Sequence, residues 1–184
     1  MRRDLGPSDT IDPVGETLIR RLRDDDSLEL LTGLLHRAYA ELGAKGFHYK
    51  AVDQSVEMTR TRVAKGECYV VERDNNVVGT AVLQPPTSPV PWCEYYDRPE
   101  VANISQLAIE PRHQRRGWGG QLMTHLEERA RVLRADEVAV DTSEGATHLI
   151  ALYERRGYRH VGFAQWSHAN FRSVLLSKRL VPER

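Results

Sequence analysis

Several features that define whole classes of protein are missing from this sequence. Its 26 Lys and Arg residues balance 26 Asp and Glu residues, so no net charge draws the chain to nucleic acid or to an anionic membrane. No apolar run reaches the roughly 18 residues of a membrane-spanning helix, and the polar N-terminus lacks the apolar stretch of a signal peptide. We therefore expect a cytoplasmic protein that binds neither nucleic acid nor membrane.

Cysteine is also scarce. Cys68 and Cys93 lie far apart, with no further cysteine at metal-binding spacing. The expected compartment does not favour a disulfide, so the sequence predicts two free thiols and no metal site.

The length and composition suit one compact domain. A chain of 184 residues with 40% hydrophobic content can build one ordinary core, whereas two full domains would be cramped. Residues 1–16 are polar and without sustained periodicity, which predicts an N-terminal arm. Residues 17–184 are then expected to form a single domain.

The first half of this domain predicts a strand, two helices and a hairpin. A short strand over 17–22 precedes an amphipathic helix near 27–42, for which Asp26 and Glu29 have the spacing of a capping box. A weaker helix is expected over 53–65. The apolar runs 68–71 and 77–83 flank Asp74-Asn75-Asn76, which is typical of a β-hairpin. The prolines that follow indicate an irregular loop, at positions 85, 86, 89 and 91.

From Val101 the pattern becomes strand, glycine-rich turn, helix, strand, helix. The expected elements are a strand over 101–109, a helix through 122–133, a short strand over 138–140, a helix around 149–153 that ends at Gly157, and final β segments over 158–163 and 171–176. A strand, helix and strand at this spacing imply a parallel pair joined by a crossover. The fold class is therefore α/β with a mixed sheet.

The most informative segment runs from Gln114 to Gly120, between the strand 101–109 and the next helix. Glycines 117, 119 and 120 leave the backbone uncovered where a helix begins, so several N–H groups without intrahelical partners can point at one anion. A diphosphate suits such a site. Nearby basic residues add positive charge, namely Arg112, His113, Arg115 and Arg116.

Taken alone, this turn is also compatible with a tight connection that carries a solvated basic face. Two known phosphate loops can be excluded. A P-loop would end in Gly-Lys-Ser/Thr where this chain has Gly119-Gly120-Gln121, and the dinucleotide fingerprint would require glycine at Leu122.

Three segments in the right order resemble the GNAT superfamily of acetyltransferases, over roughly residues 17–180. The acyl-CoA loop of that family reads Gln/Arg-x-x-Gly-x-Gly/Ala, which Gln114, Gly117 and Gly119 match at every specified position. The run 107–111 resembles the strand and proline before this loop, and the run 152–158 resembles the later Leu-Tyr-x-x-x-Gly-Phe/Tyr element.

The resemblance implies a mostly antiparallel central sheet with flanking helices, in which the parallel strands 101–109 and 138–141 splay apart at one end. Acetyl-CoA would be the co-substrate, without a metal. Its pantetheine would lie in the gap, where its amides need partners once they leave water. The residues expected to bind acetyl-CoA are Leu107, Ala108, Ile109, Gln114, Arg115, Arg116, Gly117, Trp118, Gly119 and Gly120.

The catalytic acid that the resemblance implies is Tyr153. It matches the family tyrosine that returns a proton to the leaving thiolate, and a phenol with a pKa near 10 suits that role. Tyr153 also lies on the apolar face of its predicted helix, so plain packing is the competing interpretation.

The general base is harder to place. Many family members carry Glu where this chain has Asn103, and an amide cannot accept a proton at neutral pH. Glu94, Glu100 and His48 are alternative bases that act directly or through water, although such residues are more often plain surface groups.

A second departure from the family lies before the last helix, where Ala146 replaces a frequent Asn that reaches the cofactor. Nearby polar groups are candidates for that role, namely Asp141, Thr142, Ser143 and Glu144. The aromatic residues Trp92, Tyr95 and Tyr96 either line the acceptor pocket or fill the edge of the core.

The resulting hypothesis is an N-acetyltransferase in which an amine of unknown identity attacks the thioester directly. The amine belongs to a small molecule, a peptide or a protein, and the enzyme is a monomer or homodimer. The alternative is an acyl-CoA-binding sensor or interaction module with little activity, favoured by Asn103 and Ala146. A nucleic-acid binder that uses the Arg112–Arg116 cluster is disfavoured by its few basic residues and by the neutral charge.

Overall fold

A computed structural model describes residues 17–88 and 90–180, which form one seven-stranded sheet in the order β1-β2-β3-β4-β5-β7-β6. The strands are β1 (Thr17–Arg21), β2 (Glu67–Arg73), β3 (Asn76–Gln84), β4 (Val101–Ile109), β5 (Glu137–Ser143), β6 (Arg159–Ala164) and β7 (Ser173–Arg179). The helices are α1 (Leu28–Ala44), α2 (Val56–Val63), α3 (Trp118–Val132) and α4 (Thr147–Arg155), with 3₁₀ turns η1 (Lys50–Val52) and η2 (Pro111–His113). The N-terminal arm expected at 1–16 lies outside the described residues.

Only β4 and β5 run parallel among neighbouring strands of this sheet; the other pairs are antiparallel. The predicted α/β class, with a mixed and mostly antiparallel sheet, is therefore confirmed. The hairpin is also confirmed, since Asp74 and Asn75 connect β2 to β3 with φ values of 50° and 60°. Two successive positive φ angles are typical of the turn whose twist matches antiparallel strands.

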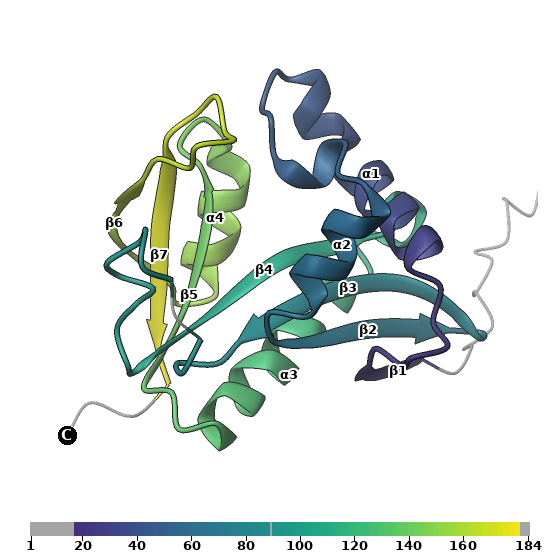
Figure 1. The fold of residues 1–184 in the computed structure, drawn as a ribbon, viewed down its shortest axis with the longest axis horizontal. Helices are drawn as coiled ribbons and strands as arrows, with labels where there is room; N and C mark the ends of the chain where they lie inside the picture. Colours follow the sequence, from purple (N-terminus) through teal and green to yellow (C-terminus); the bar gives the residue numbers. More distant parts are fainter. Residues whose placement is uncertain (1–16, 89, 181–184) are drawn as a thin grey trace, which may run out of the picture.

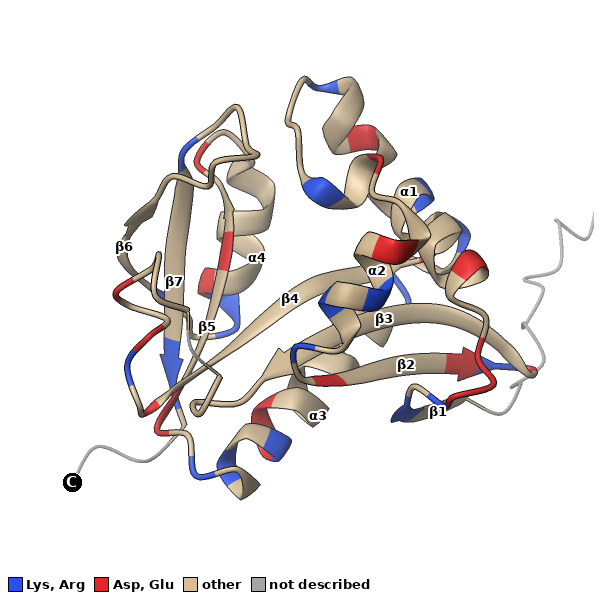
Figure 2. Ribbon diagram, viewed as in Figure 1, with Lys and Arg blue, Asp and Glu red and all other residues tan. Residues whose placement is uncertain are grey.

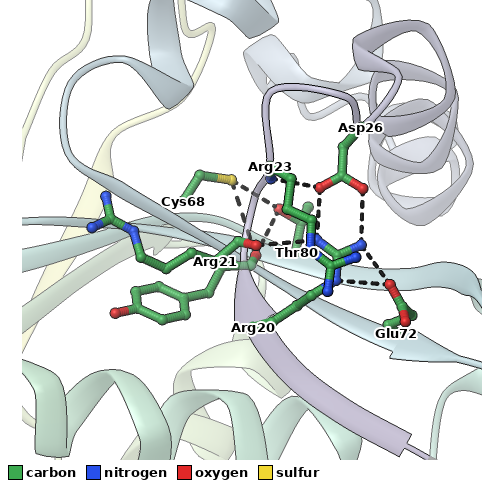
Figure 3. A network of polar contacts seen from close by, with 8 residues as sticks. Arg20, Arg21, Arg23, Asp26, Cys68, Glu72 and Thr80 are labelled. Atoms are coloured by element: carbon green, nitrogen blue, oxygen red, sulfur yellow. Dashed lines mark hydrogen bonds and ion pairs between the residues drawn. The ribbon is translucent and has the colours of Figure 1, made fainter.

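The start of α1 differs from its prediction by one residue. Ser27 caps the helix and accepts a hydrogen bond from the Leu30 N–H at 3.2 Å, so Asp26 is not the capping residue. Asp26 instead receives both Nη atoms of Arg20, at 2.7 and 2.8 Å, as Figure 3 shows. Arg20 also donates to Glu72 on β2 through Nε at 2.7 Å. A partly buried arginine thereby holds the β1–α1 connection on the sheet.

Helices cover both faces of the sheet (Figure 1). Tyr69 and Val71 of β2 belong to the same core cluster as Leu122 and Leu126 of α3. Cys68 and Val70, which alternate with them along the strand, pack with residues of α1 instead. Because side chains of a strand alternate between faces, α1 and α3 lie on opposite sides of the sheet. Both cysteines are buried free thiols.

The parallel strands part after three residue pairs. β4 and β5 are in register at Val101↔Glu137, Ala102↔Val138 and Asn103↔Ala139, and beyond Asn103 each strand pairs only with its other neighbour. Gln106 has a φ of 55°, where the pairing of β4 with β3 is irregular. Figure 1 shows β4 and β5 diverging, with α1 and α2 on one side of the opening and α4 on the other. The predicted splay is confirmed.

Charged residues are interspersed along the elements rather than gathered by sign, as Figure 2 shows. None of the helices within 17–88 and 90–180 has the length and apolar character needed to cross a membrane.

Candidate active site

A cleft of about 1390 Å³ opens where β4 and β5 diverge. Its walls include the second half of β4, the start of α3, one face of α4, and residues of α1, η1 and α2. All the residues predicted to bind acetyl-CoA line this cleft except Arg116, which is exposed outside it. Tyr153 lines the same cleft. The structure thus brings the glycine-rich turn and the predicted acid to one cavity.

The turn before α3 presents unpaired amides. Arg115 and Gly117 have φ values of 60° and 85°, and Gly117 is the N-cap residue of the helix. The first hydrogen bond of this helix runs from Gln121 N–H to Gly117 O at 3.0 Å. Within the described chain, the N–H groups of residues 117–120 have no acceptor. Bare amides at the positive end of a helix dipole form an anion site.

The glycines of this turn differ in whether backbone conformation or packing requires them. Gly117 needs its positive φ, which L side chains rarely adopt. At Gly119, in contrast, an added Cβ would lie 3.5 Å from Ile109 Cγ1, an ordinary contact. Neither packing nor backbone conformation requires glycine at 119, whereas close approach of a ligand would. The turn therefore fits a bound diphosphate.

The edge of β4 that faces the opening carries two carbonyls with side-chain partners. Glu110 N–H donates to Val78 O on β3 at 2.8 Å, so by alternation Ile109 and Leu107 direct their backbone groups away from β3. Leu107 O accepts from Tyr39 Oη at 3.1 Å, and Ile109 O accepts from Gln114 Nε2 at 3.1 Å. A carbonyl has two lone pairs, so both can accept a further bond from an extended ligand.

Tyr153 on α4 is only 8% exposed. Its hydroxyl has no hydrogen-bond partner within the described chain, although the residue lines the cleft. Burial, followed by the proximity of Tyr39, Asp141 and Tyr49, raises the pKa of Tyr153 above its ordinary value. The phenol is therefore protonated at neutral pH and has a proton to donate.

None of the three candidate bases predicted from the sequence lines the cleft. Glu94 is exposed, Glu100 accepts a hydrogen bond from Arg98, and His48 is exposed beside Asn170; none lines the cleft. Asn103 does line it and is 3% exposed, at the last residue pair before the strands part. The usual Glu position thus belongs to the site but carries no base.

Asp141 and His168 are among the other titratable residues that line the cleft. Asp141 projects from β5 and accepts from Tyr96, Trp166 and Ser173 at 3.2, 2.8 and 2.9 Å. His168 comes from the β6–β7 connection, and its pKa is lowered by burial and then by Lys50 and Arg62. Sequence reasoning named Asp141 only as a neighbour of Ala146 and missed His168, because no local pattern marks one histidine of a loop.

Some of the other residues predicted for the site line the cleft, and others lie outside it. Trp92 and Tyr96 line it, whereas the Tyr95 hydroxyl turns to Glu137 outside. Thr142 lines the cleft and shares a 2.8 Å hydrogen bond with Tyr49 Oη.

The remaining polar candidates near the last helix do not face the cleft. Ser143 donates its N–H to Tyr49 Oη at 2.8 Å, and exposed Glu144 pairs with Arg172. Ala146 is the buried N-cap residue of α4 and provides no side-chain cap. Within the part of the chain that the structure describes, His, Cys, Asp and Glu side chains form no group able to hold a metal ion.

The model of the acetyltransferase (GNAT) family matches residues 29–158, which include the parted strands, the glycine-rich turn and Tyr153. The chain belongs to the GNAT acetyltransferase family. It is an N-acetyltransferase, in agreement with the prediction.

Known GNAT proteins resemble this chain in sequence and in structure. The S-(2-succino)cysteine N-acetyltransferase of Bacillus subtilis is 28% identical over 144 residues, which cover 77% of this chain and 84% of that protein. The ribosomal-protein-S18-alanine N-acetyltransferase of Escherichia coli superposes with a TM-score of 0.68 at 16% identity, covering 92% and 97% of the two chains. A GNAT acetyltransferase of Elizabethkingia anophelis, solved with acetyl-CoA bound, has a TM-score of 0.62 at 19% identity, covering 89% and 97%.

Proposed function

We propose that this enzyme transfers the acetyl group of acetyl-CoA to the primary amine of a small molecule, by direct attack of the amine on the thioester. One observation carries the proposal: the unpaired amides of residues 117–120 and the protonated hydroxyl of Tyr153 face the same cleft. The amides can bind the diphosphate of CoA, and the hydroxyl can protonate the thiolate that leaves. Acetyl transfer from a CoA thioester requires both.

The residues have separate tasks in this reaction. Residues 117–120 hold the diphosphate, and the outward backbone of Leu107 and Ile109 pairs with pantetheine amides, as an added strand would. As the amine nitrogen bonds to the acetyl carbon, the carbon–sulfur bond breaks and the electron pair stays on sulfur. Tyr153 Oη gives its proton to that sulfur. The amine loses its proton to the neutral imidazole of His168, directly or through water.

One relative supports a small acceptor. The similar Bacillus subtilis enzyme is named for S-(2-succino)cysteine, a derivative of an amino acid. The cleft is lined by residues of α1, η1 and α2 on one side and of α4 on the other. Its volume of about 1390 Å³ has room for a small amine beside the acetyl end of acetyl-CoA.

The alternative, a sensor that binds acyl-CoA without turnover, has less support. Asn103 removes the usual base, but His168 and Asp141 line the same cleft. Tyr153 lines the cleft, and its hydroxyl has no hydrogen-bond partner among the described residues. Such a free proton donor serves an enzyme, whereas a binding module would not need it.

Thiol release from acetyl-CoA across a panel of amines tests the proposal. We expect turnover with small primary amines, and a fall of about 10²- to 10⁴-fold in kcat for Tyr153→Phe, the range that a general acid contributes. Acetyl-CoA affinity should stay the same in that variant, because the phenol acts on the leaving sulfur. Tight acetyl-CoA binding without turnover on any amine would favour the sensor, and unchanged kcat in Tyr153→Phe would show that the acid is another group.

A further inference from the structure

Arg62 differs from the other partly buried arginines of this protein. Arg20 is paired with Asp26 and Glu72, Arg129 with Glu67, and Arg156 with Glu127. Arg62, on the last turn of α2, lines the cleft, and no carboxylate of the described chain lies within ion-pair distance of it. Its Nη1 donates to a neutral acceptor instead, the Oε1 atom of Gln54 at 2.6 Å. The guanidinium therefore lacks the counter-charge that its counterparts have.

A buried network of neutral groups fixes the partner of Arg62. Gln54 is 5% exposed, and its Nε2 donates to Thr59 Oγ1 at 2.7 Å and to Gln106 Oε1 at 3.0 Å. Thr59 also accepts from Thr32 Oγ1 of α1 at 2.7 Å. Gln106 is the residue of β4 with positive φ, in the strand that forms the cleft wall. Arg62 is thus oriented by α1, by its own helix and by β4, without being neutralised.

A second cation shares this part of the cleft. Lys50 of η1 lines it, and the pKa of Lys50 is lowered by burial and then by the charges of Arg62 and Lys65. Burial likewise lowers the pKa of Arg62, and the smaller effects of Tyr39 and Asp141 oppose this change without forming an ion pair. Two desolvated cations held near each other cost free energy unless an anion joins them.

The carboxylate of the opposite wall does not supply that anion. Asp141 accepts hydrogen bonds from the neutral donors Tyr96, Trp166 and Ser173, and forms no ion pair with Arg62 or Lys50. Its negative charge nevertheless faces the cleft, where it would attract an ammonium group. This part of the cleft therefore presents the carboxylate of Asp141 and the two partly buried cations Arg62 and Lys50, which complement a molecule that carries both an amine and an anion.

We infer that the acceptor is an amino-acid-like molecule whose carboxylate is bound by Arg62 and Lys50 while its amine lies toward Asp141 and Tyr153. This inference rests on the proposed function and names the acceptor class within it. A guanidinium with a fixed orientation suits a planar carboxylate, to which it can donate two parallel hydrogen bonds. Polyamines and other amines without an anionic group would leave both cations unpaired and are expected to be poor acceptors.

Matched acceptor pairs provide the test. Each of several L-amino acids is assayed beside its carboxamide, which keeps the amine and side chain but has no anion. The wild-type enzyme should prefer the acid by at least about tenfold in kcat/KM. The reason is that the carboxamide cannot form the charged hydrogen bonds that the carboxylate makes with Arg62 and Lys50. Equal kcat/KM values for every acid and amide would overturn the inference and leave the proposed function intact.

Variants then assign the preference to Arg62. Arg62→Met should lower kcat/KM for the acids by about 10- to 100-fold and hardly change it for the amides. Arg62→Lys, which keeps the charge, should retain part of the preference. Arg60→Met is the matched control, because exposed Arg60 on the same helix pairs with Glu57 and does not line the cleft.

The outcomes separate the two proposals. Acetyl-CoA affinity and the circular dichroism of the variants show whether the fold and the donor site are intact. An Arg62→Met enzyme that binds acetyl-CoA normally and still prefers acids would overturn the inference. If the wild-type enzyme binds acetyl-CoA but acetylates neither acids nor amides nor any other amine, the proposed function fails and the inference fails with it.

Discussion

The hydroxyl of Tyr39 donates to the backbone carbonyl of Leu107 at 3.1 Å, which attaches α1 to the edge of β4 that faces the cleft. The Tyr39 ring packs edge-on against Tyr49 with centroids 5.6 Å apart. Tyr49 in turn accepts the N–H of Ser143 on β5 at 2.8 Å. Two phenols thus connect the parted strands and set the width of the opening.

Removing either hydroxyl should loosen this connection. Tyr39→Phe and Tyr49→Phe are each expected to lower the free energy of unfolding by about 1 to 2 kcal/mol, because a partner is left unpaired at a partly buried site. The double variant should show a coupling of about 0.5 kcal/mol or more, since the rings are in contact. Urea unfolding of the three variants measures this. Additive effects would show that the phenols act independently.

The pH dependence of turnover tests the role of His168. Burial, and then the charges of Lys50 and Arg62, lower the pKa of His168, while Asp141 acts in the opposite direction. A base with a lowered pKa stays neutral, and so active, to more acidic pH. At saturating acceptor, the acidic limb of kcat should therefore lie below about pH 6.5, the ordinary value for histidine. His168→Gln should lower kcat and remove that limb; a limb that persists in His168→Gln belongs to another group.

Acid should weaken the attachment of α3 to the sheet. Arg129 of α3, with a smaller effect of Tyr69, lowers the pKa of Glu67 on β2 from 4.5 to about 2. A depressed carboxyl pKa stabilises the fold above the unfolded value, and this stability is lost as pH falls from about 4.5 toward 2.

Glu67→Gln provides the measurement. It should lower the free energy of unfolding at neutral pH by on the order of 2 kcal/mol and reduce the further loss between pH 6 and pH 3. Glu57→Gln is the control, since exposed Glu57 pairs only with exposed Arg60. A pH profile of Glu67→Gln parallel to that of the wild type would contradict the assignment.

Local chemistry explains which parts of this protein could be predicted from sequence. Periodicity located every strand and helix within a few residues, because alternation and helical spacing record burial directly. The glycine-rich turn could be predicted because the glycines that uncover the amides at the helix start lie close together in the sequence. Asp26 was misassigned as a cap because it pairs with Arg20, whose guanidinium also binds Glu72 of the neighbouring strand β2, and only the folded sheet brings these three residues together.

The acceptor side could not be predicted for the same reason. Arg62, Lys50, Asp141 and His168 come from four segments and meet only across the opening between β4 and β5. None has a spacing to the others in sequence that signals a site. The folded structure was also needed to show that Glu94, Glu100 and His48 lie away from the cleft.

If the amides of residues 117–120 hold the diphosphate of acetyl-CoA, a change at Gly119 should alter the affinity for acetyl-CoA, which calorimetric titration measures. The pair Gly119→Gln and Gly119→Glu differs only in charge, and an acidic residue in the first turn favours the helix itself. We expect Gly119→Glu to lose at least about tenfold more affinity than Gly119→Gln while both stay folded. Equal, wild-type affinity in both variants would contradict it.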